Sequence, residues 1–314
     1  MTSDKSTQLT NVSLQLFGHD DTFYNLTKLY ENGQFPKVNL ISGEKGIGKF
    51  TLIFHLIIYF FSKIQKKHYN LNNKTIDKDN LILNKIKSNT FQNFFYFPNE
   101  DKNKLSIENV REIKKVLYNS TLDSSPRFII FDDVEFLNNN AVNSLLKMIE
   151  EPSNNNYFIL INNKRNKLIE TLKSRSIETK IFLNLHQKNS ILSQLLKCNG
   201  IDNLFMRNYS NLTTPGMLIK YHNILSKINI SPDTPFYDAT SILLEKYKKD
   251  KQDIYIDFIK FFLETKFWET SSFNKQNFIS LLKTKNDIFK ILYNYKKFNL
   301  TNSTVLNFVR NSIN

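Results

Sequence analysis

The chain has 314 residues, of which 40% are hydrophobic and 13% aromatic, a composition typical of folded globular proteins and not of disordered ones. Its single cysteine, Cys198, excludes a disulfide framework and any multi-cysteine zinc site. The net charge of +14 accompanies a general richness in Lys, Asn, Ile, Phe and Tyr, as A/T-rich coding DNA produces, so it indicates only a weak attraction to polyanions.

The N-terminus and the most apolar run argue against secretion and membrane insertion. Residues 1–6 are polar and lack the features of a signal peptide. The most apolar run, residues 52–61, is shorter than the ~20 residues needed to cross a bilayer, and it contains His55. We therefore expect a cytoplasmic protein without a membrane segment.

A turn, a helix and a strand open the chain. Residues 16–19 form a turn, and apolar residues then recur at helical spacing from Phe23 to Tyr30. Gly33 ends this helix, and residues 38–41 form a short apolar strand. A glycine-rich segment follows and leads into the helical run 52–61.

This segment, residues 43–51 (GEKGIGKFT), has the pattern of a phosphate-binding loop, because it lies between a strand and a helix. Its glycines let backbone N–H groups close around an anion, and Lys49 would reach the terminal phosphates. The next position should carry the Ser or Thr whose hydroxyl holds Mg²⁺, but it is Phe50. Thr51 comes one residue later, rotated by roughly 100° around the helix. The candidate nucleotide-binding residues of this degenerate loop are Gly43, Gly46, Gly48, Lys49 and Thr51.

The next stretch contains a polar insertion and a strand. Residues 64–90 are rich in Lys and Asn and give only a modest helical signal. Residues 94–97 (FFYF) predict a buried strand that Pro98 ends. Ser106 can then cap a helix.

Two further strands end in polar side chains. Residues 128–131 predict a fully buried parallel strand followed by Asp132 and Asp133, and residues 157–161 predict a strand followed by Asn163. Open α/β sheets bind ligands at the carboxyl ends of their strands. A helix over 141–149 and a last strand over 177–182 complete a doubly wound parallel sheet.

Beyond residue 183 the strand signal disappears. Helical periods recur near residues 191–196, 204–209 and 217–225, and everything after 236 has helical spacing. We predict an α/β domain over 1–182, a small helical lid over 183–230 and a helical collar over 231–314.

These motifs, in this order, resemble the clamp-loader branch of the AAA+ ATPases, and within it the delta-prime family of bacterial DNA polymerase III subunits. The most specific match is Asp132 and Asp133 followed by residues 143–152 (NSLLKMIEEP). Further matches are the degenerate glycine loop and residues 107–111, 174–176 (SRS, similar to the family's Ser-Arg-Cys motif), 213–217 and 298–301. The four-cysteine zinc module that many of these relatives carry is missing, so we expect no zinc.

The resemblance assigns roles to four residues. Asp132 would be the acid on the Mg²⁺ side, and Asp133 stands where the family places the Glu that activates water, although a helix-capping strand end is the plainer interpretation. Asn163 could sense the terminal phosphate, or simply form a turn. Arg175 would point into a neighbouring subunit's ATP site as an arginine finger, although a random surface arginine is a solvated charge.

The resemblance therefore implies a non-hydrolysing, stator-like subunit that binds ATP and Mg²⁺ weakly at most. It would join delta and gamma/tau subunits in a hetero-pentamer, contact the sliding clamp, act on primed DNA indirectly, and reside in the bacterial cytoplasm. The alternative from another class is an active gamma/tau-type motor ATPase. A sequence-specific DNA-binding protein is disfavoured, because no recognition-helix module is present.

Overall fold

The computed structural model describes residues 12–64, 69–98, 125–152, 155–202, 207–228, 230, 234–273 and 278–313. The chain divides into two compact units, Met1–Cys198 and Asn199–Asn314. The predicted three-part division at residues 182 and 230 stays a prediction. The helix predicted after Ser106 lies outside the described residues.

A parallel sheet of five strands forms the centre of the first unit. Its strand order is β4 (Phe94–Phe97), β5 (Arg127–Phe131), β6 (Asn156–Asn162), β1 (Val38–Ser42) and β7 (Ile177–Lys180). β1 pairs in parallel with both β6 and β7. Every residue of β1 and β5 is buried, as expected for parallel strands covered on both faces. The predicted strands are therefore confirmed, although the last one ends at Lys180.

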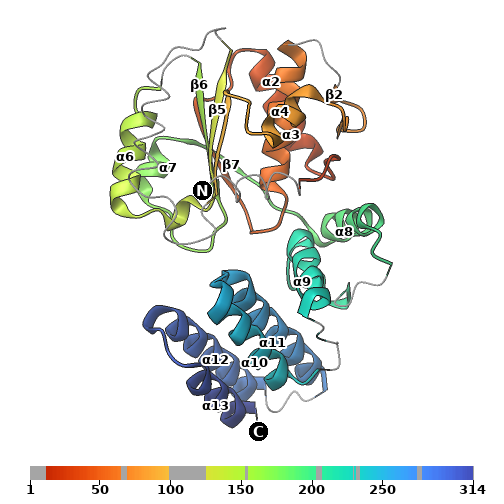
Figure 1. Cartoon of the computed structure of the whole chain (residues 1–314), viewed down its shortest axis with the longest axis vertical. Coiled ribbons are helices and arrows are strands. Elements are labelled where there is room, and N and C mark those ends of the chain that lie inside the picture. The colour runs from red at the N-terminus through yellow and green to blue at the C-terminus, as the bar shows by residue number, and fades with distance from the viewer. Residues whose placement is uncertain are drawn as a thin grey trace. The chain divides into compact units, whose positions relative to one another are not determined.

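Helices cover both faces of this sheet (Figure 1). One face carries α2 (Asp20–Glu31), α3 (Lys49–Ile64) and α4 (Leu81–Lys87), and the other carries α6 (Asn139–Ile149) and α7 (Glu170–Ser174). A 3₁₀ turn, η1 (Val134–Phe136), connects β5 to α6. The unit is thus a three-layer α/β domain.

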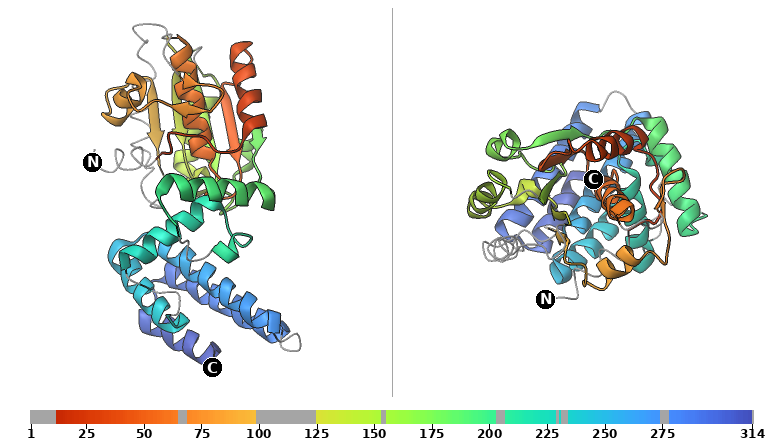
Figure 2. Two further views of the ribbon diagram at one scale, coloured as in Figure 1. Left: turned by 90° about the vertical axis from the view of Figure 1, so that its right-hand side faces the viewer. Right: turned by 90° about the horizontal axis from the view of Figure 1, so that it is seen from above.

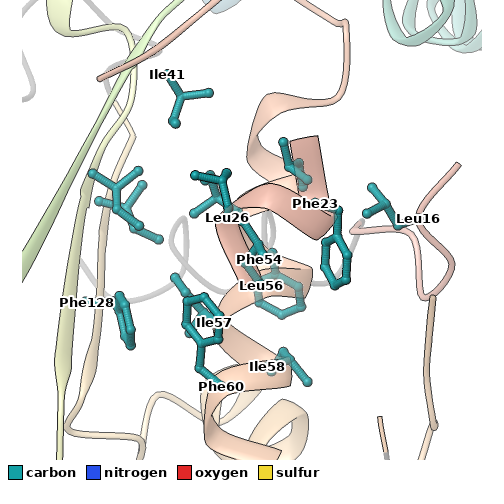
Figure 3. Close-up of a cluster of buried hydrophobic side chains, with 14 of the residues drawn as sticks. Leu16, Phe23, Leu26, Ile41, Phe54, Leu56, Ile57, Ile58, Phe60 and Phe128 are labelled. Atoms are coloured by element: carbon teal, nitrogen blue, oxygen red, sulfur yellow. The ribbon is translucent and has the colours of Figure 1, made fainter. Parts of the chain in front are cut away.

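α3 is the central element of the larger core (Figure 3). Towards the sheet, Phe60 meets Phe128 of β5 with ring centroids 5.9 Å apart. Towards α2, Tyr59 meets Phe23 at 6.2 Å. Because α3 is apolar around most of its circumference, it packs on several sides at once. This packing fixes the position of its first turn, where the glycine-rich segment ends.

The polar insertion contains a hairpin that sequence patterning did not predict. β2 (Tyr69–Asn70) and β3 (Thr75–Ile76) pair antiparallel. The stretch at residues 12–16 lies along this hairpin, since the N–H of Ile76 donates to the carbonyl of Leu14 at 2.8 Å. α4 follows, and the Asn80 side chain caps it by accepting from two backbone N–H groups. The insertion therefore contributes Ile76, Ile82, Leu83 and Ile86 to the larger core.

The second unit is helical over its described residues. Its elements are η2 (Arg207–Tyr209), α9 (Pro215–Ile228), α10 (Phe236–Asp250), α11 (Asp253–Phe273), α12 (Phe278–Phe298) and α13 (Asn302–Ile313), whereas α8 (Leu185–Asn199) belongs to the first unit up to Cys198. α10 packs against α11 and α13, and the long α11 and α12 lie side by side (Figure 2). The helical periods predicted after residue 236 are confirmed. Of the helix predicted at 204–209, only the 3₁₀ turn at 207–209 is described. None of the described helices combines the length and the apolar character needed to span a membrane.

Candidate functional site

The candidate site lies at the carboxyl ends of three neighbouring strands. A glycine loop (residues 43–48) follows β1, Asp132 and Asp133 follow β5, and Asn163 follows β6. Since β5, β6 and β1 are adjacent and parallel, their polar ends meet at one edge of the sheet. The structure therefore brings together the residues that the sequence analysis selected here.

Backbone geometry explains the glycines of the loop. Gly46 and Gly48 have φ angles of 80° and 101°, which side chains rarely allow. At Gly43, a Cβ atom would lie 2.6 Å from the carbonyl oxygen of Ile181. That approach exists because the chain leaving β7 stays hydrogen-bonded to β1, with the N–H of Ile181 donating to the carbonyl of Ser42 at 2.7 Å.

His19, at the start of α2, holds the loop from the other side. Its Nε2 donates to the carbonyl oxygen of Ile47 at 2.8 Å, since that oxygen can only accept. Burial lowers the pKa of His19, and the bond to Ile47 offsets part of this shift. The sequence analysis placed His19 in a turn and missed this contact, because a link across 28 residues leaves no periodic signal.

Lys49 is the first residue of α3 and is almost fully buried. Its Nζ donates to the carbonyl oxygens of Gly43 at 2.8 Å and of Glu44 at 2.7 Å. Burial lowers the pKa of Lys49 to about 8, while Asp132, Glu135 and Asp133 oppose the shift. The ammonium is thus bound by the carbonyl oxygens of the loop itself.

Asn163 joins the two acids. Its Nδ2 donates to Oδ1 of Asp132 at 2.9 Å and to Oδ1 of Asp133 at 2.7 Å. Burial and the neighbouring Asp133 raise the pKa of Asp132, although the backbone N–H of Asp133 and Lys49 both stabilise its charged form. The amide therefore fixes the positions of both carboxylates.

Glu135 is a further site residue that the sequence analysis did not select. Its buried carboxylate accepts from the backbone N–H of Asn163 at 3.1 Å and of Arg165 at 3.2 Å. Burial raises the pKa of Glu135. Its position two residues after Asp133 placed it near the site in the sequence. Its partners, however, are backbone N–H groups of the segment that follows β6, which the sequence around Glu135 does not reveal.

Phe50 replaces the hydroxyl residue expected after Lys49, and its half-buried ring packs on Tyr96 of β4 with ring centroids 4.3 Å apart. Thr51 lies one residue further along α3. Magnesium, which this class of site implies, needs about six oxygen ligands in near-octahedral geometry. Aromatic carbon at position 50 supplies none, so the residues present do not fit the metal. Among the described residues, no group of three or more His, Cys, Asp or Glu side chains could hold a metal ion.

Arg175 lies apart from these residues, just after α7 on the surface of the first unit. Its Nε donates to Oε1 of Glu150 at 2.9 Å, and a terminal nitrogen donates to the carbonyl of Thr171 at 3.4 Å. The side chain is 39% exposed to solvent.

The strand order, the glycine loop after β1 and the polar ends of β5 and β6 define an AAA+ α/β domain, followed here by helices. Within this class, the family model for "DNA polymerase III, delta subunit" matches residues 18–184, more than half of the chain. The chain therefore belongs to this family of DNA polymerase III clamp-loader subunits.

The individual relatives are of two kinds, some named subunit delta-prime and others named subunit gamma. The chain is 29% identical over 197 residues to DNA polymerase III subunit delta-prime of Buchnera aphidicola subsp. Schizaphis graminum, covering 61% of this chain and 55% of the relative. It is 25% identical over 305 residues to subunit gamma of the same organism, covering 85% and 80%. A solved gamma subunit-related protein of Thermotoga maritima has a TM-score of 0.48 at 13% identity, covering 92% of this chain and 98% of that chain. The chain thus spans about half the length of the delta-prime relative.

Proposed function

We propose that this chain is a delta-prime-type clamp-loader subunit that does not hydrolyse ATP and that supplies Arg175 to the ATP site of a neighbouring subunit. The observation that carries the proposal is that the glycine loop keeps its glycines and its lysine but lacks the hydroxyl residue that would hold the metal. The loop has the glycines and the lysine of a phosphate site, with Lys49 bonded to the carbonyls of Gly43 and Glu44, whereas Phe50, packed on Tyr96, stands where the metal-binding hydroxyl residue is expected.

The acids support the absence of hydrolysis. Asp133 is one methylene shorter than the Glu that would activate water, and its Oδ1 is already engaged by Asn163. The site therefore binds ATP weakly at most and needs no cofactor for the subunit's role. Hydrolysis would take place in the gamma/tau subunits.

Arg175 is suited to act outside its own subunit. Among the described residues its ionic partner is Glu150, which is itself 48% exposed, and an exposed ion pair contributes about 0–1 kcal/mol. Breaking this ion pair so that the guanidinium can bind a phosphate therefore costs little free energy. Its planar, permanently charged fork matches the oxygens of a transferring phosphoryl group.

The helices of the second unit offer a surface for partners. Large apolar side chains are exposed there, including Trp268 on α11, Ile279 on α12 and Phe308 on α13. We propose that these helices form the collar that holds the chain with delta and gamma/tau subunits in a hetero-pentamer. Through that complex the chain would help to load the sliding clamp onto primed DNA.

The alternative is a gamma/tau-type motor, which the relative named gamma favours because that match covers most of both chains. Phe50 and the shortened Asp133 count against it. Steady-state phosphate release by the purified chain with ATP and Mg²⁺ distinguishes the two: the stator gives none, and turnover by the unmodified chain identifies a motor.

The arginine is tested by Arg175→Ala in a clamp loader reconstituted with its partner subunits. Assembly should be unchanged, because exposed substitutions alter stability by about 0.5 kcal/mol or less. Hydrolysis at the adjacent site should fall on the order of 10³-fold, while the remaining sites keep their activity. Phosphate release and clamp loading on primed DNA measure both effects.

Two controls accompany this variant. Lys173→Ala removes a charge from the same exposed turn and should leave both rates unchanged. Arg175→Lys keeps the charge but loses the fork, so it should not rescue hydrolysis. Wild-type rates for Arg175→Ala would show that the residue is only a surface charge.

A further inference from the structure

Two aromatic rings from distant parts of the sequence meet beside the glycine loop. Phe50 lies in the first turn of α3, and Tyr96 lies in β4 at the edge of the sheet. Their ring centroids are 4.3 Å apart with an interplanar angle of 37°, and the ring of Phe54 lies 6.1 Å from that of Phe50. Tyr96 is 8% exposed. The pair fills the space between position 50 and Asp132, which we call the metal corner.

Tyr96 also reaches the acid of this corner. Its hydroxyl donates to Oδ2 of Asp132 at 3.1 Å. The other oxygen, Oδ1, accepts from the backbone N–H of Asp133 at 2.8 Å and from the Asn163 amide at 2.9 Å. Both oxygens of Asp132 are therefore bonded to protein donors.

A magnesium ion would have to displace these contacts. It needs oxygen ligands at about 2.0–2.1 Å and retains several of its waters when it binds to protein. The ring of Phe50 has no oxygen to offer and fills space that such waters would need. The Tyr96 hydroxyl donates to one of the two carboxylate oxygens that Asp132 could offer to a metal.

We propose that Tyr96 and Phe50 together close the metal corner, so that restoring a hydroxyl at position 50 does not by itself create a Mg²⁺ site. The inference deepens the proposed function, since it names a second residue that excludes the metal from the same site. Its test uses the isolated chain and no partner subunit. The experiment on Arg175 can therefore contradict the proposed function without contradicting this inference. Equally, this inference can be contradicted while the role of Arg175 stands.

The experiment measures the rise in Tm of the full chain that Mg²⁺ adds at a fixed concentration of ADP, relative to ADP with EDTA. Wild type, Phe50→Ser and Tyr96→Phe should each show no added rise. In Phe50→Ser the Tyr96 hydroxyl still occupies Asp132, and in Tyr96→Phe the hydroxyl at position 50 is still missing. The double variant Phe50→Ser/Tyr96→Phe should show an added rise in Tm of about 5 °C or more when the concentration of the Mg²⁺–ADP complex is 100 times its dissociation constant from the protein.

The matched control is Phe50→Ala/Tyr96→Phe, which opens the same space without supplying a hydroxyl and should show no added rise. Should Phe50→Ser fail to fold by near-UV circular dichroism, Phe50→Thr supplies the hydroxyl with an extra methyl group. A Mg²⁺-dependent rise in wild type or in Phe50→Ser alone would overturn the proposal. So would the absence of a rise in the folded double variant.

Discussion

His55 is a single side chain that ties three segments of the first unit together. It is fully buried in α3. Its Nε2 donates to the carbonyl of Ser13 at 3.0 Å, which leaves Nδ1 to accept from the hydroxyl of Tyr69 at 3.1 Å. Burial lowers the pKa of His55 to about 4, and the bond to Ser13 offsets part of the shift. The neutral ring satisfies both partners, whereas a protonated ring loses its acceptor.

We predict that His55 makes the fold acid-sensitive. Between the ordinary pKa of 6.5 and about 4, the unfolded chain binds a proton on His55 that the folded chain does not bind. The free energy of unfolding therefore falls as pH falls through this window, by about 1.4 kcal/mol per pH unit and about 3 kcal/mol in total. Urea unfolding between pH 7.5 and 4 measures the slope.

The control for this prediction is His55→Gln, whose amide can donate and accept but does not titrate. Its stability should decline less steeply than that of wild type over the same window, because the remaining acids contribute equally to both. Parallel pH profiles for the two proteins would contradict the assignment to His55.

Whether a site residue could be predicted depended on how much of its role the neighbouring sequence reveals. Lys49, Asp132 and Asn163 were predictable, because each follows a recognisable strand and the ends of parallel strands must meet. Tyr96, Glu135 and His19 were not selected. Each acts through a partner on another element, and nothing in the sequence around Tyr96 distinguishes a ring that reaches Asp132 from an ordinary core residue.

At the scale of elements, α4 shows that a segment rich in Lys and Asn can still contribute buried residues to the core. The insertion around it is rich in Lys and Asn, but Ile82, Leu83 and Ile86 of α4 are all buried. The helical strength of this segment comes from the Asn80 cap and from packing, not from its modest periodicity. The neighbouring hairpin of β2 and β3 was missed because strands of two residues carry no alternating pattern.

We predict that Ile82→Ala destabilises the first unit by about 2–5 kcal/mol, because it leaves a cavity beneath α4. Leu81 precedes it on the same helix and is 48% exposed, so Leu81→Ala should change stability by about 0.5 kcal/mol or less. Urea unfolding compares the two variants directly. Equal and small losses would mean that the insertion lies on the surface without supporting the core.

At the scale of the whole molecule, the first compact unit extends past the last strand to include α8. Ile191, Leu192 and Leu196 of α8 are buried. Ile191 lies against the turn before α2, where a Cβ atom on Gly18 would approach its Cδ1 to 2.7 Å. Periodicity located α8 correctly but could not reveal which neighbour its apolar face covers.

We predict that a fragment of residues 1–198 folds cooperatively and melts at a higher temperature than a fragment of residues 1–182. The shorter fragment exposes the surface around Gly18 that Ile191 covers. Thermal unfolding followed by circular dichroism compares the two fragments. Equal melting temperatures would show that α8 contributes nothing to the first unit, and would support a domain boundary at residue 182.

The position of β1 in the sheet has a consequence for the order in which the chain can be assembled. β1 is complete at residue 42, but both of its neighbours, β6 and β7, are made of residues 156–162 and 177–180. During translation, the strand that carries the glycine loop therefore has no pairing partner until more than a hundred further residues have been synthesised. Such long-range parallel pairing is slow and leaves apolar strand edges exposed in the meantime. The nascent chain is thus most vulnerable to aggregation before Lys180 leaves the ribosome.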